Sequence, residues 1–225
     1  MMESPEFYYE ERLKGKSQEM ILTHIRGLKQ EIGRLKKILE HPEYPFREDV
    51  ICPGEDVQLA CTLEYLEVAK RALAETGKPY IPSKMEEKVI AFNERLQYLQ
   101  EVSFCIGGFS SPGYIKTVKI VNEDLHLGSK RLPTQDEIQE VVAEDFAEAF
   151  IGNVRSLNLG SWRRNYDTHR YGIAVLDGTQ WELNLSFNDG RRGVIFRGDN
   201  AYPYNFRKME EVFDDLWLEA FEINA

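Results

Sequence analysis

The sequence has few cysteines and no long hydrophobic run. Its three cysteines are an odd number at unrelated spacings, which excludes a disulfide framework and a zinc knuckle and suits a reducing compartment: Cys52, Cys61 and Cys105. No stretch approaches the roughly 18 apolar residues that cross a membrane, and the acidic start lacks the basic and apolar regions of a signal peptide. We therefore predict a cytoplasmic protein without a membrane partner.

The motifs of common catalytic sites are also missing. There is no Gly-rich phosphate loop ending in Lys-Ser/Thr, no His-Glu-x-x-His pair and no Gly-x-Ser-x-Gly turn. The four histidines lack the spacing of metal ligands: His24, His41, His126 and His169. We predict no catalytic, metal-binding or cofactor-binding residue. An enzyme of unrecognised type would need titratable groups such as His169, Asp177 and Cys105 to meet in a pocket.

The 225 residues, of which 42% are hydrophobic, suffice for one large domain or two small ones. Heptad spacing predicts a helix over residues 21–39, with an apolar stripe formed by Ile21, Ile25, Leu28, Ile32, Leu35 and Leu39. The pattern lasts under three heptads, which is short for an independent coiled coil. We therefore expect the stripe to pack inside a monomer, and a dimer through residues 21–39 is the alternative.

Two further helices are expected before residue 100. One begins at Glu55, after a Pro-Gly turn, and ends at Gly77. The other begins at Ser83, where Ser-Lys-Met-Glu is a capping box, and its apolar residues are spaced four and three apart: Met85, Val89, Phe92, Leu96 and Leu99. Residues 1–100 are thus predicted to form a bundle of about three helices.

Near Glu101 the apolar period changes to two, which marks the start of a sheet. Later runs alternate in the same way and are separated by two Asp-Gly turns: residues 171–175, 181–187 and 194–197. Two helices would cover this antiparallel meander, one over 134–150 with a Thr134–Glu137 capping box and one over 205–221. The predicted fold class is α+β, with a helical bundle in residues 1–100 and an antiparallel sheet domain in residues 101–225.

The stretch RGDNAYPYNF, residues 197–206, joins the last strand to the last helix. Gly198 permits a turn, Asn200 can bond its own backbone, and Pro203 excludes another central strand. Asn205 is a plausible helix cap. We interpret the stretch as a structural corner, and a binding site is the alternative.

The chain resembles a known module at this corner. The segments DGTQWELNLSF (177–187) and GDNAYPYNF (198–206) are similar to a recurring C-terminal module of uncharacterised bacterial proteins, in which a D-G-x-x-W-x-L strand precedes a G-x-N-A-Y-P-x-N-F turn. The resemblance covers about the last 60 residues. It implies a bacterial cytoplasmic origin and carries no catalytic residue.

Charge is distributed unevenly along the chain. The formal net charge of −10 argues against the whole protein being a nucleic-acid binder. Residues 132–150 and 209–225 each carry six acids and no base, whereas residues 151–208 carry nine bases and five acids. We therefore expect a basic strand region between two acidic helices.

Arginines alternate with aromatic residues in this basic region. The candidate binding residues are Trp162, Arg163, Arg164, Tyr166, Arg170, Tyr171, Arg191, Arg192 and Arg197. We predict a non-catalytic binding or adaptor protein whose partner is another protein. A nucleic-acid-binding accessory is the alternative, because arginines and rings suit phosphate contact and base stacking. Pairing of the arginines with the acidic helices would make the surface structural.

Overall fold

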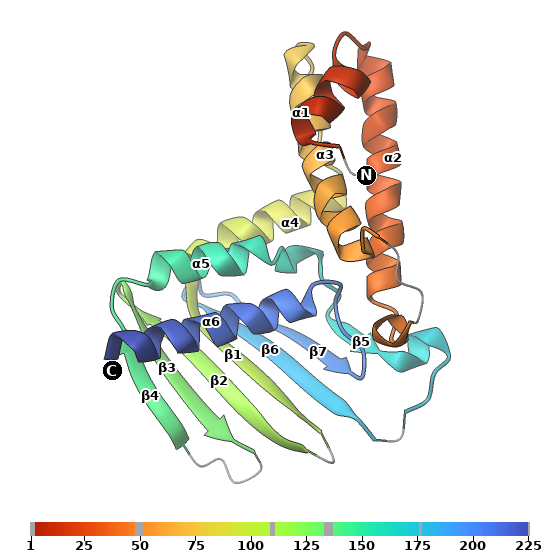
Figure 1. Cartoon of the computed structure of the whole chain (residues 1–225). Helices are drawn as coiled ribbons and strands as arrows, with labels where there is room; N and C mark the ends of the chain where they lie inside the picture. The colour runs from red at the N-terminus through yellow and green to blue at the C-terminus, as the bar shows by residue number, and fades with distance from the viewer. Residues whose placement is uncertain (1–2, 48–51, 109–110, 133–136, 176, 225) are drawn as a thin grey trace. The chain divides into compact units, whose positions relative to one another are not determined.

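The computed structural model divides the chain into two compact units, Met1–Pro82 and Ser83–Ala225. It describes residues 3–47, 52–108, 111–132, 137–175 and 177–224. The chain is a mixed α/β protein (Figure 1), whose described residues form six α-helices and a seven-stranded, mostly antiparallel sheet.

The first unit is helical. Its elements are α1 (Pro5–Tyr8), the π-helical turn η1 (Tyr9–Leu13), α2 (Gln18–Leu39), the 3-10 turn η2 (Tyr44–Phe46) and α3 (Glu55–Glu75). The hydroxyls of Ser4 and Ser17 cap α1 and α2 by accepting hydrogen bonds from first-turn N–H groups. Tyr8 stacks on Tyr65 with 4.4 Å between the ring centroids, so the N-terminal segment packs against α3.

The predicted apolar stripe lies on the buried side of α2. Ile21, Ile25 and Leu35 are buried, and Leu28 and Ile32 are partly buried against the core of the first unit. Residues of α3 supply much of that core. The stripe therefore packs against residues of its own chain.

The second unit contains the sheet, whose strand order is β4-β3-β2-β1-β6-β7-β5. The strands are β1 (Leu99–Gly108), β2 (Ser111–Val121), β3 (Asp124–Arg131), β4 (Glu137–Ala143), β5 (Asn165–Asp167), β6 (Thr179–Phe187) and β7 (Val194–Asp199). Neighbours are antiparallel except for β5, which lies parallel to β7. The sheet has more strands than the predicted meander. The additional strands β1, β2, β3 and β4 join it through the pairing of β6 with the distant β1.

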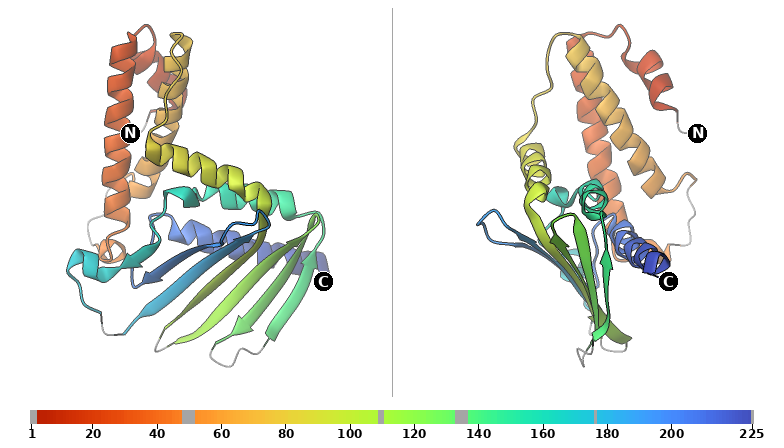
Figure 2. Two further views of the ribbon diagram at one scale, coloured as in Figure 1. Left: turned by 180° about the vertical axis from the view of Figure 1, so that it is seen from behind. Right: turned by 90° about the vertical axis from the view of Figure 1, so that its left-hand side faces the viewer.

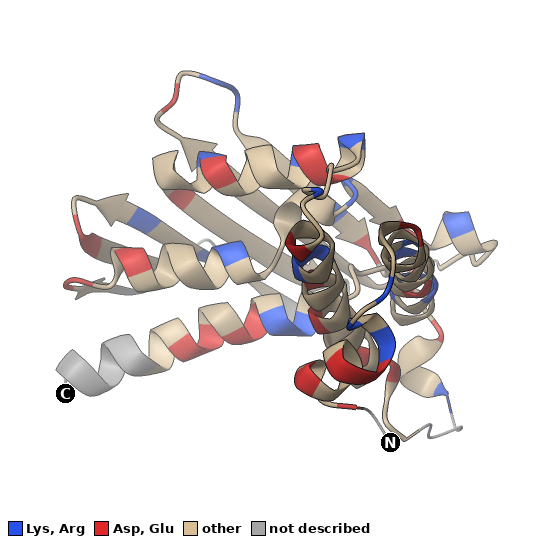
Figure 3. Ribbon diagram, turned by 90° about the horizontal axis from the view of Figure 1, so that it is seen from above, with Lys and Arg blue, Asp and Glu red and all other residues tan. Residues whose placement is uncertain are grey.

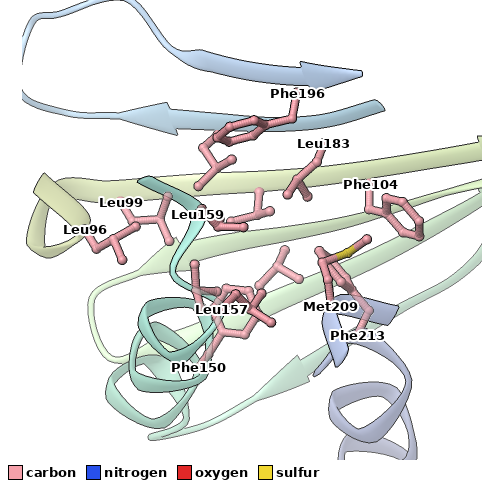
Figure 4. Packing of buried hydrophobic residues seen from close by; sticks show 14 of the residues in the cluster. Leu96, Leu99, Phe104, Phe150, Leu157, Leu159, Leu183, Phe196, Met209 and Phe213 are labelled. Atoms are coloured by element: carbon pink, nitrogen blue, oxygen red, sulfur yellow. The ribbon is translucent and has the colours of Figure 1, made fainter. Parts of the chain in front are cut away.

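One face of the sheet carries the core of the second unit. Strands turn alternate side chains toward it, including Phe104, Leu183 and Phe196. The helices α5 (Ala147–Ser156) and α6 (Phe206–Asn224) lie along this face (Figure 2). Phe150 of α5 and Phe213 of α6 pack into the same cluster (Figure 4). We call this the covered face and the opposite one the uncovered face.

The helix α4 (Lys84–Arg95) begins at the predicted capping box. Ser83 accepts a hydrogen bond from the N–H of Glu86, whose carboxylate accepts one from the N–H of Ser83. Phe92 of α4 joins the core of the sheet unit, as does Leu96 in the 3-10 turn η3 (Leu96–Tyr98). The boundary between the units therefore lies after Pro82 and not near residue 100, as predicted from the sequence. Helix α4 belongs to the unit that contains the sheet.

The helix predicted over residues 134–150 does not form. The described part of this segment is strand β4 followed by the start of α5, and Thr134 lies outside the described residues. The spacing of Ile138, Val141 and Val142 by three and four residues is typical of a helix, but in the strand Val141 packs against the core and Val142 is exposed. Backbone pairing with β3 favours the strand, a contact that local periodicity does not reveal.

The strand predicted over residues 171–175 is also wrong. The 3-10 turn η5 (Thr168–Tyr171) ends at Gly172, whose φ of 72° is left-handed and incompatible with a continuing strand. The short strand β5 lies just before this turn. Its parallel partner β7 is distant in the sequence, so no local pattern predicts the pairing.

Candidate functional site

The corner at residues 198–206 is held by its own side chains. Asn200 has a φ of 51°, and its Oδ1 accepts a hydrogen bond from the N–H of Thr179 at 2.8 Å. A Cβ on Gly178 would lie 1.7 Å from that Oδ1, and one on Gly198 would lie 2.0 Å from Nε1 of Trp181. Each glycine thus leaves the space that a partner side chain occupies. This packing supports the structural interpretation of the corner.

The same corner is tied to the segment before β5. The indole N–H of Trp162 donates to Oδ1 of Asn205 at 2.8 Å, and the side-chain amide of Asn205 donates to the carbonyl of Leu157 at 2.8 Å. Trp181 donates to the carbonyl of Ala201 at 3.0 Å. The polar groups of both indoles are therefore satisfied inside the protein.

The aromatic residues of the candidate surface are mainly core residues. Trp162 is 7% exposed and Tyr166 is 3% exposed. The Tyr166 hydroxyl accepts a hydrogen bond from the N–H of Arg163 at 3.0 Å, and Tyr171 is partly buried. Trp162 and Tyr166 thus present no open ring face on which a base could stack.

The candidate arginines are divided among several places. Arg197 lies on the uncovered face of the sheet and pairs with Glu182 at 2.7 Å. The guanidinium of Arg163 lies over the Tyr166 ring, 4.6 Å from its centroid. Arg170 is exposed in η5. The partners of Arg197 and Arg163 are thus distinct from Asp189, the partner of Arg191.

Two of the candidate residues lie beside Arg95: Arg191 shares its carboxylate partner, Asp189, and Arg192 contacts it through the backbone carbonyl. Arg95 contacts Asp189 through Nε at 2.7 Å and Nη2 at 3.0 Å, while Arg191 contacts it through Nη2 at 2.6 Å. The Nη2 of Arg95 also donates to the carbonyl of Arg192 at 2.9 Å. The side chains of Arg95 and Asp189 are only 10% and 8% exposed, and the hydrogen bond from Arg95 holds the pKa of Asp189 well below its usual range.

Arg164 lies near this group and is held by an aromatic ring. Its guanidinium carbon lies 4.7 Å from the centroid of Phe196, as that of Arg95 lies 3.9 Å from the centroid of Phe187. Phe92 touches both rings edge-on. Partial burial, and then the charge of Arg95, lower the pKa of Arg164. We call Arg95, Arg164, Arg191 and Arg192 the arginine corner.

Among the described residues, no ion pair joins the arginine corner to the acidic helix α6. Asp214 of α6 pairs instead with Lys116 of β2, and Arg191 and Arg197 have their described partners, Asp189 and Glu182, in or beside the sheet. Figure 3 shows acidic positions along α6 and basic positions at its start. The acids around Glu144 and Asp215, expected as alternative partners, have no described pair with these two arginines.

The titratable residues proposed for an enzyme are not brought together into a recognisable site. Cys105 lies on the uncovered face, where partial burial raises the pKa of its thiol, and His169 and Asp177 are exposed. Among the described residues no three His, Cys, Asp or Glu side chains gather as metal ligands. In the same part of the chain, no helix is long and apolar enough to cross a membrane.

The comparisons with known proteins give no match: no protein-family model, no curated protein and no solved structure is similar to this chain.

Sequence reasoning missed Arg95, which lies 94 residues before Asp189 in the chain. Arg95 lies in the last turn of α4, where a positive charge interacts favourably with the helix dipole, and this alone does not mark it as a binding residue. Its pairing depends on the packing of α4 beside the β6–β7 turn, for which no local pattern exists.

Proposed function

We propose that this chain is a non-catalytic binding protein of the bacterial cytoplasm and that it recognises an acidic segment of another protein. The observation that carries the proposal is the arginine corner, where Arg95 and Arg191 hold Asp189 and the neighbouring Arg164 and Arg192 bring the formal excess to three positive charges. Because the whole chain has a net charge of −10, this positive charge is confined to one part of its surface. It would attract an acidic partner and orient it.

A protein partner is favoured over a nucleic acid because the stacking rings are buried. Recognition of single strands uses aromatic side chains with free faces, and those of Trp162 and Tyr166 lie in the core. The remaining arginines could contact phosphates without distinguishing bases. Nucleic-acid binding is therefore the second candidate and one arm of the test.

We further propose that the protein acts as a monomer in which α1, α2 and α3 form a small helical bundle. The supporting observation is that the stripe over residues 21–39 already packs against α3. A dimer through residues 21–39 is the alternative.

The test uses a synthetic peptide of alternating Glu and Ala and a single-stranded oligonucleotide, each bound to the full chain and followed by fluorescence anisotropy. The double variant Arg191→Glu, Arg192→Glu should weaken peptide binding by about tenfold or more, because like charges would then face each other. The matched control is Arg207→Glu, Lys208→Glu, which changes the same charge at the exposed start of α6 and should bind the peptide as the wild type does.

Equal losses in the two double variants would mean that only net charge matters, and the proposed site would be wrong. Preferential binding of the oligonucleotide, with affinity that falls steeply with salt, would favour the nucleic-acid candidate. No binding of the peptide at low salt would overturn the proposal.

A further inference from the structure

We infer that the arginine corner binds a phosphate group carried by the partner protein. This inference rests on the proposed function and names the chemical group that the site would recognise. It is drawn from how the guanidinium groups of Arg95, Arg164 and Arg191 are held and from what balances the positive charge of the corner.

The charge of the site favours a dianion. Asp189 already occupies the fork of Arg95 and also contacts Arg191. Within the described part of the chain, neither Arg164 nor Arg192 has an ion pair. A single carboxylate from a partner would leave two of the three excess charges, whereas a phosphate monoester carries about −1.5 to −2 at neutral pH.

Two of the guanidinium groups, those of Arg95 and Arg164, lie over aromatic rings before a ligand arrives. Arg95 is held by the Phe187 ring and by Asp189, and Arg164 is held by the Phe196 ring. Phe92, in contact with both rings, is itself a core residue. A guanidinium that lies over a ring keeps its N–H groups pointing outward in its own plane, so that they are available to an oxygen ligand.

Arg164 is an exposed residue whose guanidinium lies over the Phe196 ring, close enough to Arg95 to feel its positive charge. Burial and the nearby positive charge of Arg95 lower its pKa, which means that the site disfavours its charged form. A bound phosphate would reverse both effects by supplying acceptors and negative charge.

The residue type also matches this ligand. All four cations of the corner are arginines, whose planar guanidinium donates two parallel hydrogen bonds to phosphate oxygens. A phosphate has three oxygens and can contact several guanidinium groups at once. Lysines would instead act as mobile point charges.

The experiment compares three versions of the Glu-Ala peptide with a central Ser, phosphoserine or Glu. We expect the phosphoserine peptide to bind about tenfold more tightly than the Glu peptide, a ratio typical of added charge-assisted hydrogen bonds. Arg164→Gln should reduce the ratio of the two affinities to near one, and Arg164→Lys should give an intermediate ratio. Arg207→Gln, an exposed arginine outside the corner, should leave the ratio unchanged.

Inorganic phosphate is the competing ligand in the same assay. It should displace the phosphoserine peptide, yet only at concentrations far above the Kd of the peptide. Equal affinity of the phosphoserine and Glu peptides would overturn the inference and leave the proposed function standing. If inorganic phosphate alone bound as tightly as the peptide, the site would serve the free ion and the inference would be wrong. Thermal melting of each variant checks that it is folded.

Discussion

Trp181 is the side chain that joins β6 and β7 to the start of α6. Its ring lies 4.9 Å from that of Phe206 and 6.2 Å from that of Trp162, measured between centroids. Its N–H is bonded to the carbonyl of Ala201. Its position in the alternation with Leu183, Leu185 and Phe187 predicts burial, and the burial is confirmed.

Truncation of this ring should be costly. We expect Trp181→Ala to lower the free energy of unfolding by about 3–5 kcal/mol, because it leaves a cavity and an unpaired carbonyl at Ala201. Tyr98→Ala is the control, since that ring is largely exposed, and should change stability by about 0.5 kcal/mol or less. Denaturant melts measure both. Equal small losses would show that Trp181 does not support the core.

Asp189 should make the second unit sensitive to acid. Its pKa is lowered in the folded state, mainly by the hydrogen bond from Arg95, so its contribution is present above the unfolded pKa of about 3.9 and is lost as pH falls through the folded value. The denaturation midpoints of the wild type and Asp189→Asn should therefore differ most at neutral pH. The gap should begin to narrow below about pH 4.

The exposed Asp177→Asn is the control for that titration and should follow the wild type at every pH. A gap between the wild type and Asp189→Asn that stays constant down to strongly acidic pH would mean that the carboxylate charge contributes nothing.

At the scale of elements, a capping box and a tight turn could be located from the sequence, whereas a strand without such a local signal could not. The Ser83–Glu86 capping box predicted the start of α4, and the Asp189-Gly190 turn predicted the link between β6 and β7. β4 was missed because the three- and four-residue spacing of its apolar residues is typical of a helix. Pairing with β3, a non-local contact, favours the strand.

The apolar stripe of α2 gives a prediction for the first unit. Ile25→Ala should cost about 2–5 kcal/mol, because Ile25 is buried against the core formed with α3. Arg26→Ala, next to it and exposed, should have little effect. Sedimentation should give a monomer for the wild type. A dimer that Ile32→Asp dissociates into folded monomers would instead place the stripe between two chains.

At the scale of the whole molecule, the apolar periodicity predicted a mixture of helices and strands but not the boundary between the two units. Helix α4 follows the other helices in sequence, yet Phe92 is buried with strand residues. The candidate site was predicted only in part for the same reason. Arg164, Arg191 and Arg192 could be selected from local charge, whereas burial of Trp162 and recruitment of Arg95 depend on contacts between distant segments.

Two pairs of residues at the turn of residues 198–206 fit closely together: Gly178 with Asn200 and Gly198 with Trp181. This fit limits how these positions can change in evolution. A lineage that replaced one member would leave the other without its space or its bond, so such positions should change together or not at all. The arginine corner, at positions 95, 164, 191 and 192, contains none of these four residues. Descendants could therefore keep the joint between strand and helix while exchanging the partner they recognise.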